Sequence, residues 1–131
     1  MQHCPNLRTV GFCSNAPCDR ILIPTLCEPA SLKGLAEAVS LIREDRTEIP
    51  IDVLRSRYKP RLRLTQDADE LLKDAAAELN YQLLQTVIPE NIAIAEAIAQ
   101  QQSVLNYAPK SSGTQAFKAL AKECSKLWKT P

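Results

Sequence analysis

The feature that most constrains the fold of this chain is an alternation of short apolar segments with longer amphipathic ones. Ile21 to Pro24 is an apolar run that ends at a proline, which is typical of a short buried strand. From Glu28 to about Arg46, apolar residues recur at three- and four-residue spacing and predict a helix, with Ser31 as the expected N-cap. Such alternation favours an α/β fold with a parallel sheet, because parallel neighbours need crossover connections.

The same alternation continues to the end of the chain. The further predicted elements are a strand at Ile49–Leu54, a helix that Thr65 caps and Asn80 ends, a strand at Leu83–Ile88, a short helix at about Ile92–Gln101 and a final helix at about Gly113–Leu127. A basic stretch, residues 55–64, separates the second strand from its helix. We therefore expect one domain with about three parallel strands and about four helices, whereas residues 1–17 fit no element well.

Composition places the chain among ordinary globular proteins and excludes several classes. Of its 131 residues 45% are hydrophobic and 24% charged, and the net charge of +1 gives no bulk attraction to nucleic acid or to an acidic membrane. No apolar run approaches the roughly 20 residues that span a bilayer, and the first residues lack a signal-peptide pattern. We expect a cytoplasmic protein with no membrane partner, and its five cysteines to be reduced thiols.

Collinear motifs relate the chain to a known family. Residues 19–35 follow the pattern "D-x-hydrophobic-hydrophobic-I-P" and then "E-x-x-S-L-x-G-L"; residues 88–97 read "I-P-x-N-x-x-x-x-E-A"; residues 107–113 read "Y-x-P-x-S-x-G". In this order and spacing they resemble the ParA/MinD family of deviant P-loop ATPases, which segregate plasmids and chromosomes or position division sites. The resemblance covers residues 19–123 and implies part of a Rossmann-like P-loop NTPase sheet.

The phosphate-binding part of that family is not found in this sequence. Family members begin with a glycine-rich loop that holds the phosphates, whereas the three glycines here, Gly11, Gly34 and Gly113, cannot form one. Gln2 falls on the family's Walker B aspartate and cannot supply a carboxylate to magnesium. The resemblance therefore implies a truncated relative, with residues 1–17 a degenerate remnant of the Walker B region and 18–131 the C-terminal half. We assign no catalytic residue and expect no ATP hydrolysis, and no ATP or Mg²⁺ cofactor, for the chain alone.

Four residues are candidates for contact with the nucleotide base. By resemblance, Pro89 and Asn91 lie in the loop that closes over adenine, and Ser56 and Arg57 form a second wall. Loops at the carboxyl ends of parallel strands line the ligand crevice of open α/β sheets, which agrees with this assignment. The alternative is a proline turn in which Asn91 only caps the next helix.

A basic stripe is the candidate DNA contact. Its members alternate along the chain and share one face if extended: Arg55, Arg57, Lys59, Arg61 and Arg63. Such a stripe contacts phosphates without reading sequence, and family members bind DNA nonspecifically through basic residues here. The alternative is a solvated loop, and Glu90 and Ala93 replace basic residues often found in the family's neighbouring loop. We expect weak DNA binding.

Two other clusters have simpler explanations. The lysine face of the last helix, Lys118, Lys122, Lys126 and Lys129, is typical of a solvated amphipathic helix, with DNA or an acidic partner as the alternative. A zinc site would use His3, Cys4, Cys13, Cys18 and Cys27, but their spacing lacks the paired ligands of structural zinc sites, so no metal is expected.

These observations support three hypotheses, in this order. The first is a relative of the partitioning ATPases. Its inherited function would be plasmid or chromosome segregation, and its nucleotide chemistry would be lost. The second is an interaction module that pairs with a full-length ParA-like protein or a partition adaptor. The third is a small metal-binding domain.

Overall fold

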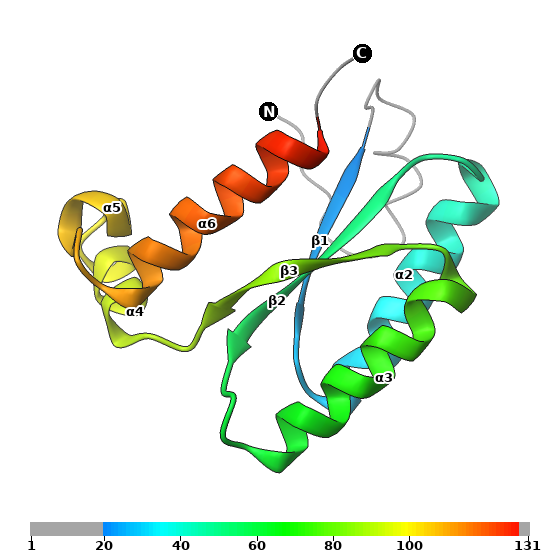
Figure 1. The fold of residues 1–131 in the computed structure, drawn as a ribbon, viewed down its shortest axis with the longest axis horizontal. Helices are drawn as coiled ribbons and strands as arrows, with labels where there is room; N and C mark the ends of the chain where they lie inside the picture. The colour runs from blue at the N-terminus through cyan, green and yellow to red at the C-terminus, as the bar shows by residue number, and fades with distance from the viewer. Residues whose placement is uncertain (1–19, 129–131) are drawn as a thin grey trace.

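The computed structural model describes residues 20–128, which form a three-stranded parallel sheet and five helices (Figure 1). The strands lie in the order β1-β2-β3. The elements are β1 (Ile21–Leu26), α2 (Pro29–Asp45), β2 (Ile51–Tyr58), α3 (Arg63–Leu79), β3 (Gln82–Pro89), α4 (Ile92–Ala99), α5 (Val104–Tyr107) and α6 (Ser112–Leu127). The α/β class with three parallel strands is confirmed, and the proposed Walker B remnant, residues 1–17, lies outside the described residues.

Helices α2 and α3 cover one face of the sheet and α6 lies on the other (Figure 1). Because side chains alternate along a strand, Ile51 and Val53 of β2 face α2 and α3, while Leu54 faces α6. The larger core combines these β2 residues with Leu35, Val39 and Ile42 of α2 and with Ala68 and Leu72 of α3. The smaller core joins Leu54, Leu84 and Ile88 to Cys124 of α6.

The strands pair regularly on one side of β2 and irregularly on the other. β1 and β2 keep one register from Ile21 opposite Ile51 to Leu26 opposite Ser56. Between β2 and β3 the register shifts after Val53 and again after Arg55. The carboxyl ends of β2 and β3 therefore depart from ideal strand geometry where ligand-binding loops of α/β folds begin.

The starts of α2 and α3 differ from the predicted ones, whereas the start of α4 at Ile92 and the stop of α3 at Asn80 are confirmed. α2 begins two residues before Ser31, because Pro29 suits a first helical position where no amide hydrogen is needed, and Glu28 is the N-cap. α3 begins at Arg63, so Thr65 is a buried residue of its first turn and not the cap. Asn80 ends α3 in the left-handed conformation, with φ 60° and ψ 56°.

The remaining differences concern segment lengths. β2 continues to Tyr58, through the start of the predicted basic stretch, and α4 ends at Ala99. The one-turn helix α5 was not predicted, since four residues carry too little periodicity to be recognised. Within residues 20–128, no helix has the length and apolarity needed to cross a bilayer.

Candidate nucleotide pocket

The carboxyl ends of β2 and β3 open into a pocket of about 770 Å³. All four residues predicted to contact a base line this pocket: Ser56, Arg57, Pro89 and Asn91. They meet because parallel neighbours end at the same edge of the sheet. The structure thus brings together the two sequence segments that the resemblance places in neighbouring loops.

The wall of the pocket is mainly apolar. Ile88 closes it from β3, Ile92 and Ile98 contribute from α4, and Phe117 reaches in from α6. Ile92 and Ile98 are 76% and 72% exposed, which is unusual for isoleucines in a folded chain. An apolar slot with a few polar groups at its rim is suited to a planar aromatic ligand such as a purine.

Asn91 caps α4, so the capping interpretation of this residue is confirmed. Its Oδ1 accepts a hydrogen bond from the amide of Ala93 at 2.8 Å, and its Nδ2 donates to Oγ of Ser112. The Asn91 amide therefore joins the start of α4 to the start of α6. This role does not exclude a ligand contact, because one Nδ2 hydrogen is left over.

Gly113 lets α4 and α6 approach closely behind the pocket. A Cβ built on Gly113 would lie 2.7 Å from Cγ1 and 2.8 Å from Cδ1 of Ile94. Next to it, Ser111 caps α6, and the buried hydroxyl of Thr114 lies 2.7 Å from the carbonyl oxygen of Ala108. The back of the pocket is therefore closely packed and hydrogen-bonded.

Glu90 pairs with two basic side chains near the pocket, and its single negative charge offsets one of their two positive charges. Lys59 Nζ lies 3.0 Å from Glu90 Oε2, and Arg57 Nε lies 3.8 Å from Oε1. Arg57 has a positive φ of 52°, an uncommon conformation for a residue with a side chain. Both basic groups thus lie beside one carboxylate of the β3–α4 loop, and Lys59 is the closer of the two.

Arg55 does not belong to an exposed stripe, and the expectation that five basic residues share one face is wrong. Its side chain is buried under α3, where Nη1 lies 2.5 Å from Asp69 Oδ1 and Nη2 donates to the carbonyl oxygen of Leu84 at 2.8 Å. The hydroxyl of Tyr58 also donates to Asp69, at 3.3 Å. The segment is a buried strand as far as Arg55, and a buried arginine needs such a partner.

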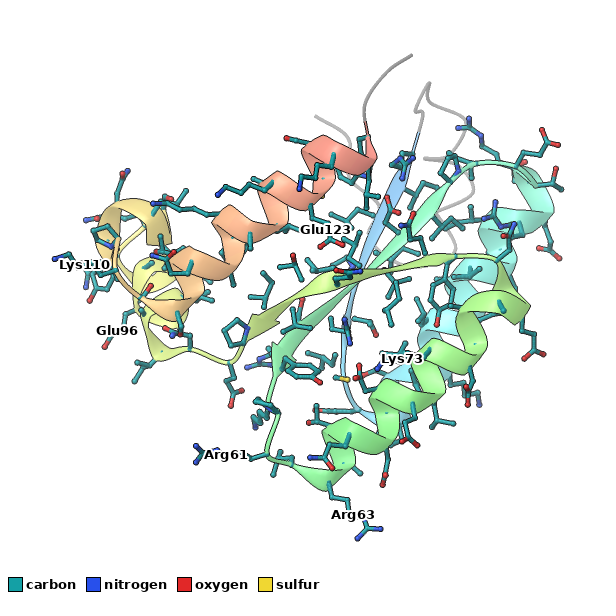
Figure 2. The ribbon with its side chains drawn as sticks, viewed as in Figure 1. Arg61, Arg63, Lys73, Glu96, Lys110 and Glu123 are labelled. Atoms are coloured by element: carbon teal, nitrogen blue, oxygen red, sulfur yellow. The ribbon has the colours of Figure 1, made fainter. Side chains whose placement is uncertain are left out.

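Arg61 and Arg63 are the two members of the stripe that remain free. Figure 2 shows both side chains pointing away from the body of the molecule, where β2 leads into α3. In the described part of the chain neither residue forms an ion pair. The basic set therefore divides into one buried residue, two that pair with Glu90 and two that are unpaired.

Glu123 is a structurally important residue that the sequence reading missed. From α6 its Oε2 and Oε1 accept hydrogen bonds from the amides of Gln85 and Thr86, at 2.7 and 2.8 Å. Burial acts to raise the pKa of Glu123, but the hydrogen bonds from Thr86 and Gln85 and the charge of Arg55 outweigh it, so the pKa is lowered. The only sequence signal was an acid among lysines on the last helix.

The irregular part of β3 is held from both sides by charged groups. Where the register shifts, the carbonyl oxygens of Leu84 and Gln85 accept from Arg55 Nη2, and the amides of Gln85 and Thr86 donate to Glu123. A bulge leaves backbone groups without strand partners, and these side chains replace them. The strand that leads into the pocket is thereby fixed.

The other candidate clusters show no ligand chemistry in what the structure describes. His3, Cys4, Cys13, Cys18 and Lys129 lie outside the described residues. Cys27 is buried, its thiol lies 3.5 Å from the carbonyl oxygen of Thr65, and burial raises its pKa, which disfavours a reactive thiolate. Lys118, Lys122 and Lys126 are exposed, as on any amphipathic surface helix.

Comparison with known proteins identifies the family. Residues 35–125, more than half of the chain, match the family model described as "Cellulose biosynthesis protein BcsQ". The chain belongs to this family. The matched BcsQ region contains β2, β3 and the whole pocket.

The resemblance to ParA, Soj and MinD proteins is also confirmed. The chain is 27% identical to the chromosome-partitioning ATPase Soj of Thermus thermophilus, over 91% of this chain and 49% of that protein. It is 29% identical to the chromosome partitioning protein ParA of Caulobacter vibrioides, over 91% and 45%. The crystal structure of the cell division ATPase MinD of Pyrococcus furiosus superposes with a TM-score of 0.64 at 26% identity, over 83% of this chain and 43% of that one.

An uncharacterized protein of Pseudomonas putida is more similar in sequence, at 34% identity over 97% of this chain and 49% of that protein. The chain thus spans about half the length of the curated relatives it matches. The three parallel strands and five helices of the described residues make a fragment of the MinD-like P-loop NTPase fold.

Proposed function

We propose that this chain is a ParA-type partition ATPase relative that provides the base-binding part of a nucleotide site and does not hydrolyse ATP by itself. The observation that carries the proposal is the pocket of about 770 Å³ in which Ser56, Arg57, Pro89 and Asn91 converge. The chain resembles a chromosome-partitioning ATPase, a chromosome partitioning protein and a cell division ATPase. The pocket lies at the carboxyl edge of the sheet, where α/β folds bind nucleotides.

The residues present fit a base better than a phosphate. Ile92, Ile98 and Phe117 offer apolar surface to a purine ring, and Asn91 offers one amide hydrogen. At the rim, the charge of Glu90 offsets one of the two positive charges of Arg57 and Lys59, so a single net positive charge is left for a triphosphate. ATP would supply the phosphoanhydride bond, but this sequence contains no glycine-rich loop to hold it.

Equilibrium binding of adenosine and of ATP with Mg²⁺ tests the proposal, with circular dichroism to show that the chain is folded. We expect both ligands to bind equally weakly, with a dissociation constant of roughly 1 mM, and no phosphate release. Ile98→Glu should abolish binding by charging the apolar wall. Leu41→Glu is the matched control, because Leu41 is an exposed leucine on α2, away from the pocket.

Two outcomes would contradict the proposal. Micromolar binding of ATP that adenosine cannot match would require a phosphate site that the sequence does not predict. A folded chain that binds neither ligand would exclude a base pocket and favour an interaction module.

The interaction module is the second candidate, and the exposure of α4 favours it. Ile92 and Ile98 are more than 70% exposed on one short helix, and apolar surface of this kind often marks a protein contact. Co-purification with a full-length ParA-like protein, lost in the double variant Ile92→Glu and Ile98→Glu, would support pairing. Retention of the complex by this variant would contradict it.

A further inference from the structure

A second, smaller cavity adjoins the pocket. It has a volume of about 210 Å³ and lies between the segments that follow β1, β2 and β3. Arg57 and Glu90 line both cavities, so the two cavities meet at this pair of residues. A ligand whose base lies in the larger cavity can therefore continue past Arg57 and Glu90 into the smaller one.

The charged groups that line the smaller cavity balance one another. Arg57 and Lys59 contribute the positive charges, Glu90 offsets one of them, and Glu28 offsets the other. The cavity thus offers no net charge to a phosphate. It does offer hydrogen-bond donors and acceptors side by side, which suits a neutral group that carries several hydroxyls.

The carboxylate of Glu90 is held in place where the cavities meet. Its backbone amide donates to the carbonyl oxygen of Tyr58 at 3.2 Å, and Lys59 Nζ lies 3.0 Å from Oε2. The nearest cation to Oε1 is Arg57 Nε at 3.8 Å, which is too far for a hydrogen bond. Since a carboxylate oxygen accepts up to two hydrogen bonds, Oε1 is available to a ligand.

Glu28 supplies a second acceptor to the smaller cavity. It is the N-cap of α2, but its side chain makes no capping hydrogen bond. It also forms no ion pair among residues 20–128. Its carboxylate is therefore not committed to the fold and can accept from a hydroxyl group.

We propose, on the basis of the base pocket proposed above, that this chain selects a nucleoside whose ribose hydroxyls lie in the smaller cavity and donate to Glu90. An acidic side chain near the base site is a known means of recognising the ribose 2′ hydroxyl in α/β folds. A phosphate adds no affinity, because the cavity is neutral. The pocket alone selects the base, whereas the two cavities together select the base with its sugar.

Ligand-observed NMR titrations with adenine, adenosine, 2′,3′-dideoxyadenosine and AMP test the proposal. Adenosine should bind about fivefold to tenfold more tightly than adenine or dideoxyadenosine, because only adenosine among these three carries the 2′ and 3′ hydroxyls. AMP should bind no more tightly than adenosine to the parent chain.

Glu90→Ala separates a role in sugar recognition from a role in the fold. This variant should bind adenosine as weakly as adenine and leave the affinity for adenine unchanged. AMP should become a tighter ligand than adenosine, because the smaller cavity then carries a net positive charge. Glu96→Gln is the matched control, since Glu96 is an exposed acid of α4 outside both cavities.

Equal binding of adenine and adenosine by the parent chain would overturn the sugar site and leave the base pocket standing. Binding of none of the four ligands by a folded chain would overturn both. An unchanged preference for adenosine in Glu90→Ala would contradict the role of Glu90. If circular dichroism shows that this variant does not fold, the comparison of adenosine with dideoxyadenosine on the parent chain decides.

Discussion

At the scale of single residues, the buried Arg55–Asp69 pair links β2 to α3, and the loss of either partner should lower the free energy of unfolding. Replacing Arg55 by Met leaves Asp69 and the carbonyl oxygen of Leu84 without their charged donor, so we expect unfolding to become easier by about 3 kcal/mol. Adding Asp69→Leu should recover at least about 1 kcal/mol, because the second buried charge then disappears.

Urea unfolding of the two single variants and the double variant measures this coupling. Arg63→Met is the control and should change stability by less than about 0.5 kcal/mol, since Arg63 is exposed. Strictly additive effects of the two core substitutions would show that the pair does not act as a unit.

Two glycines in helices test how closely α4 and α6 pack, because replacement by alanine should change the free energy of unfolding in opposite directions at the two positions. Gly113→Ala places a Cβ against Ile94 and should destabilise by about 1 to 3 kcal/mol, despite the better helix propensity of alanine. Gly34→Ala meets nothing within 4 Å and should stabilise α2 by up to about 1 kcal/mol. Thermal unfolding compares them, and the addition of Ile94→Val to Gly113→Ala should restore part of the loss.

At the scale of elements, Glu123 ties α6 to the irregular part of β3 and should make stability depend on pH. Because its folded-state pKa is lowered, its contribution is fully present above the ordinary glutamate pKa of about 4.3 and is lost as the pH falls through the folded-state value. Glu123→Gln should cost about 1 to 3 kcal/mol at pH 7 and progressively less as the pH falls towards 3.

Unfolding free energies of the parent chain and of Glu123→Gln, measured from pH 7 to pH 3, test this linkage. Glu70→Gln is the control, since Glu70 is an exposed residue of α3. If the difference in unfolding free energy between Glu123→Gln and the parent chain is the same at all pH values, the stabilisation does not come from the ionised carboxylate of Glu123.

The elements themselves were largely predictable, while their irregularities were not. The stop at Asn80 and the strand end at Pro89 follow from local chemistry, namely a left-handed cap and a residue without an amide hydrogen. The burial of Arg55 was not predictable, because strand alternation says which residues share a face but not where that face is covered. Glu123 depends on a register shift in β3 that no local pattern specifies.

At the scale of the whole molecule, topology accounts for the part of the pocket that sequence motifs predicted. Ser56 and Asn91 come together because β2 and β3 are adjacent parallel strands, and this follows from the order of the elements alone. The contribution of Phe117 to the pocket wall was not predicted, because it depends on how α6 packs against α4 at Gly113.

The distribution of charge over the whole molecule leads to a final prediction about DNA. Five cooperating cations would give a slope of about −4 to −5 for the logarithm of the binding constant against the logarithm of salt concentration. In the structure only Arg61 and Arg63 of that set are unpaired, so we expect weak binding with a slope of about −2, measured by fluorescence anisotropy on a labelled duplex. Arg61→Gln with Arg63→Gln should flatten the slope further, while Lys73→Gln, on the exposed side of α3, should leave it unchanged. A slope near −4 in the parent chain would mean that Arg57 and Lys59 leave Glu90 to contact phosphates, and that the loop rearranges on binding.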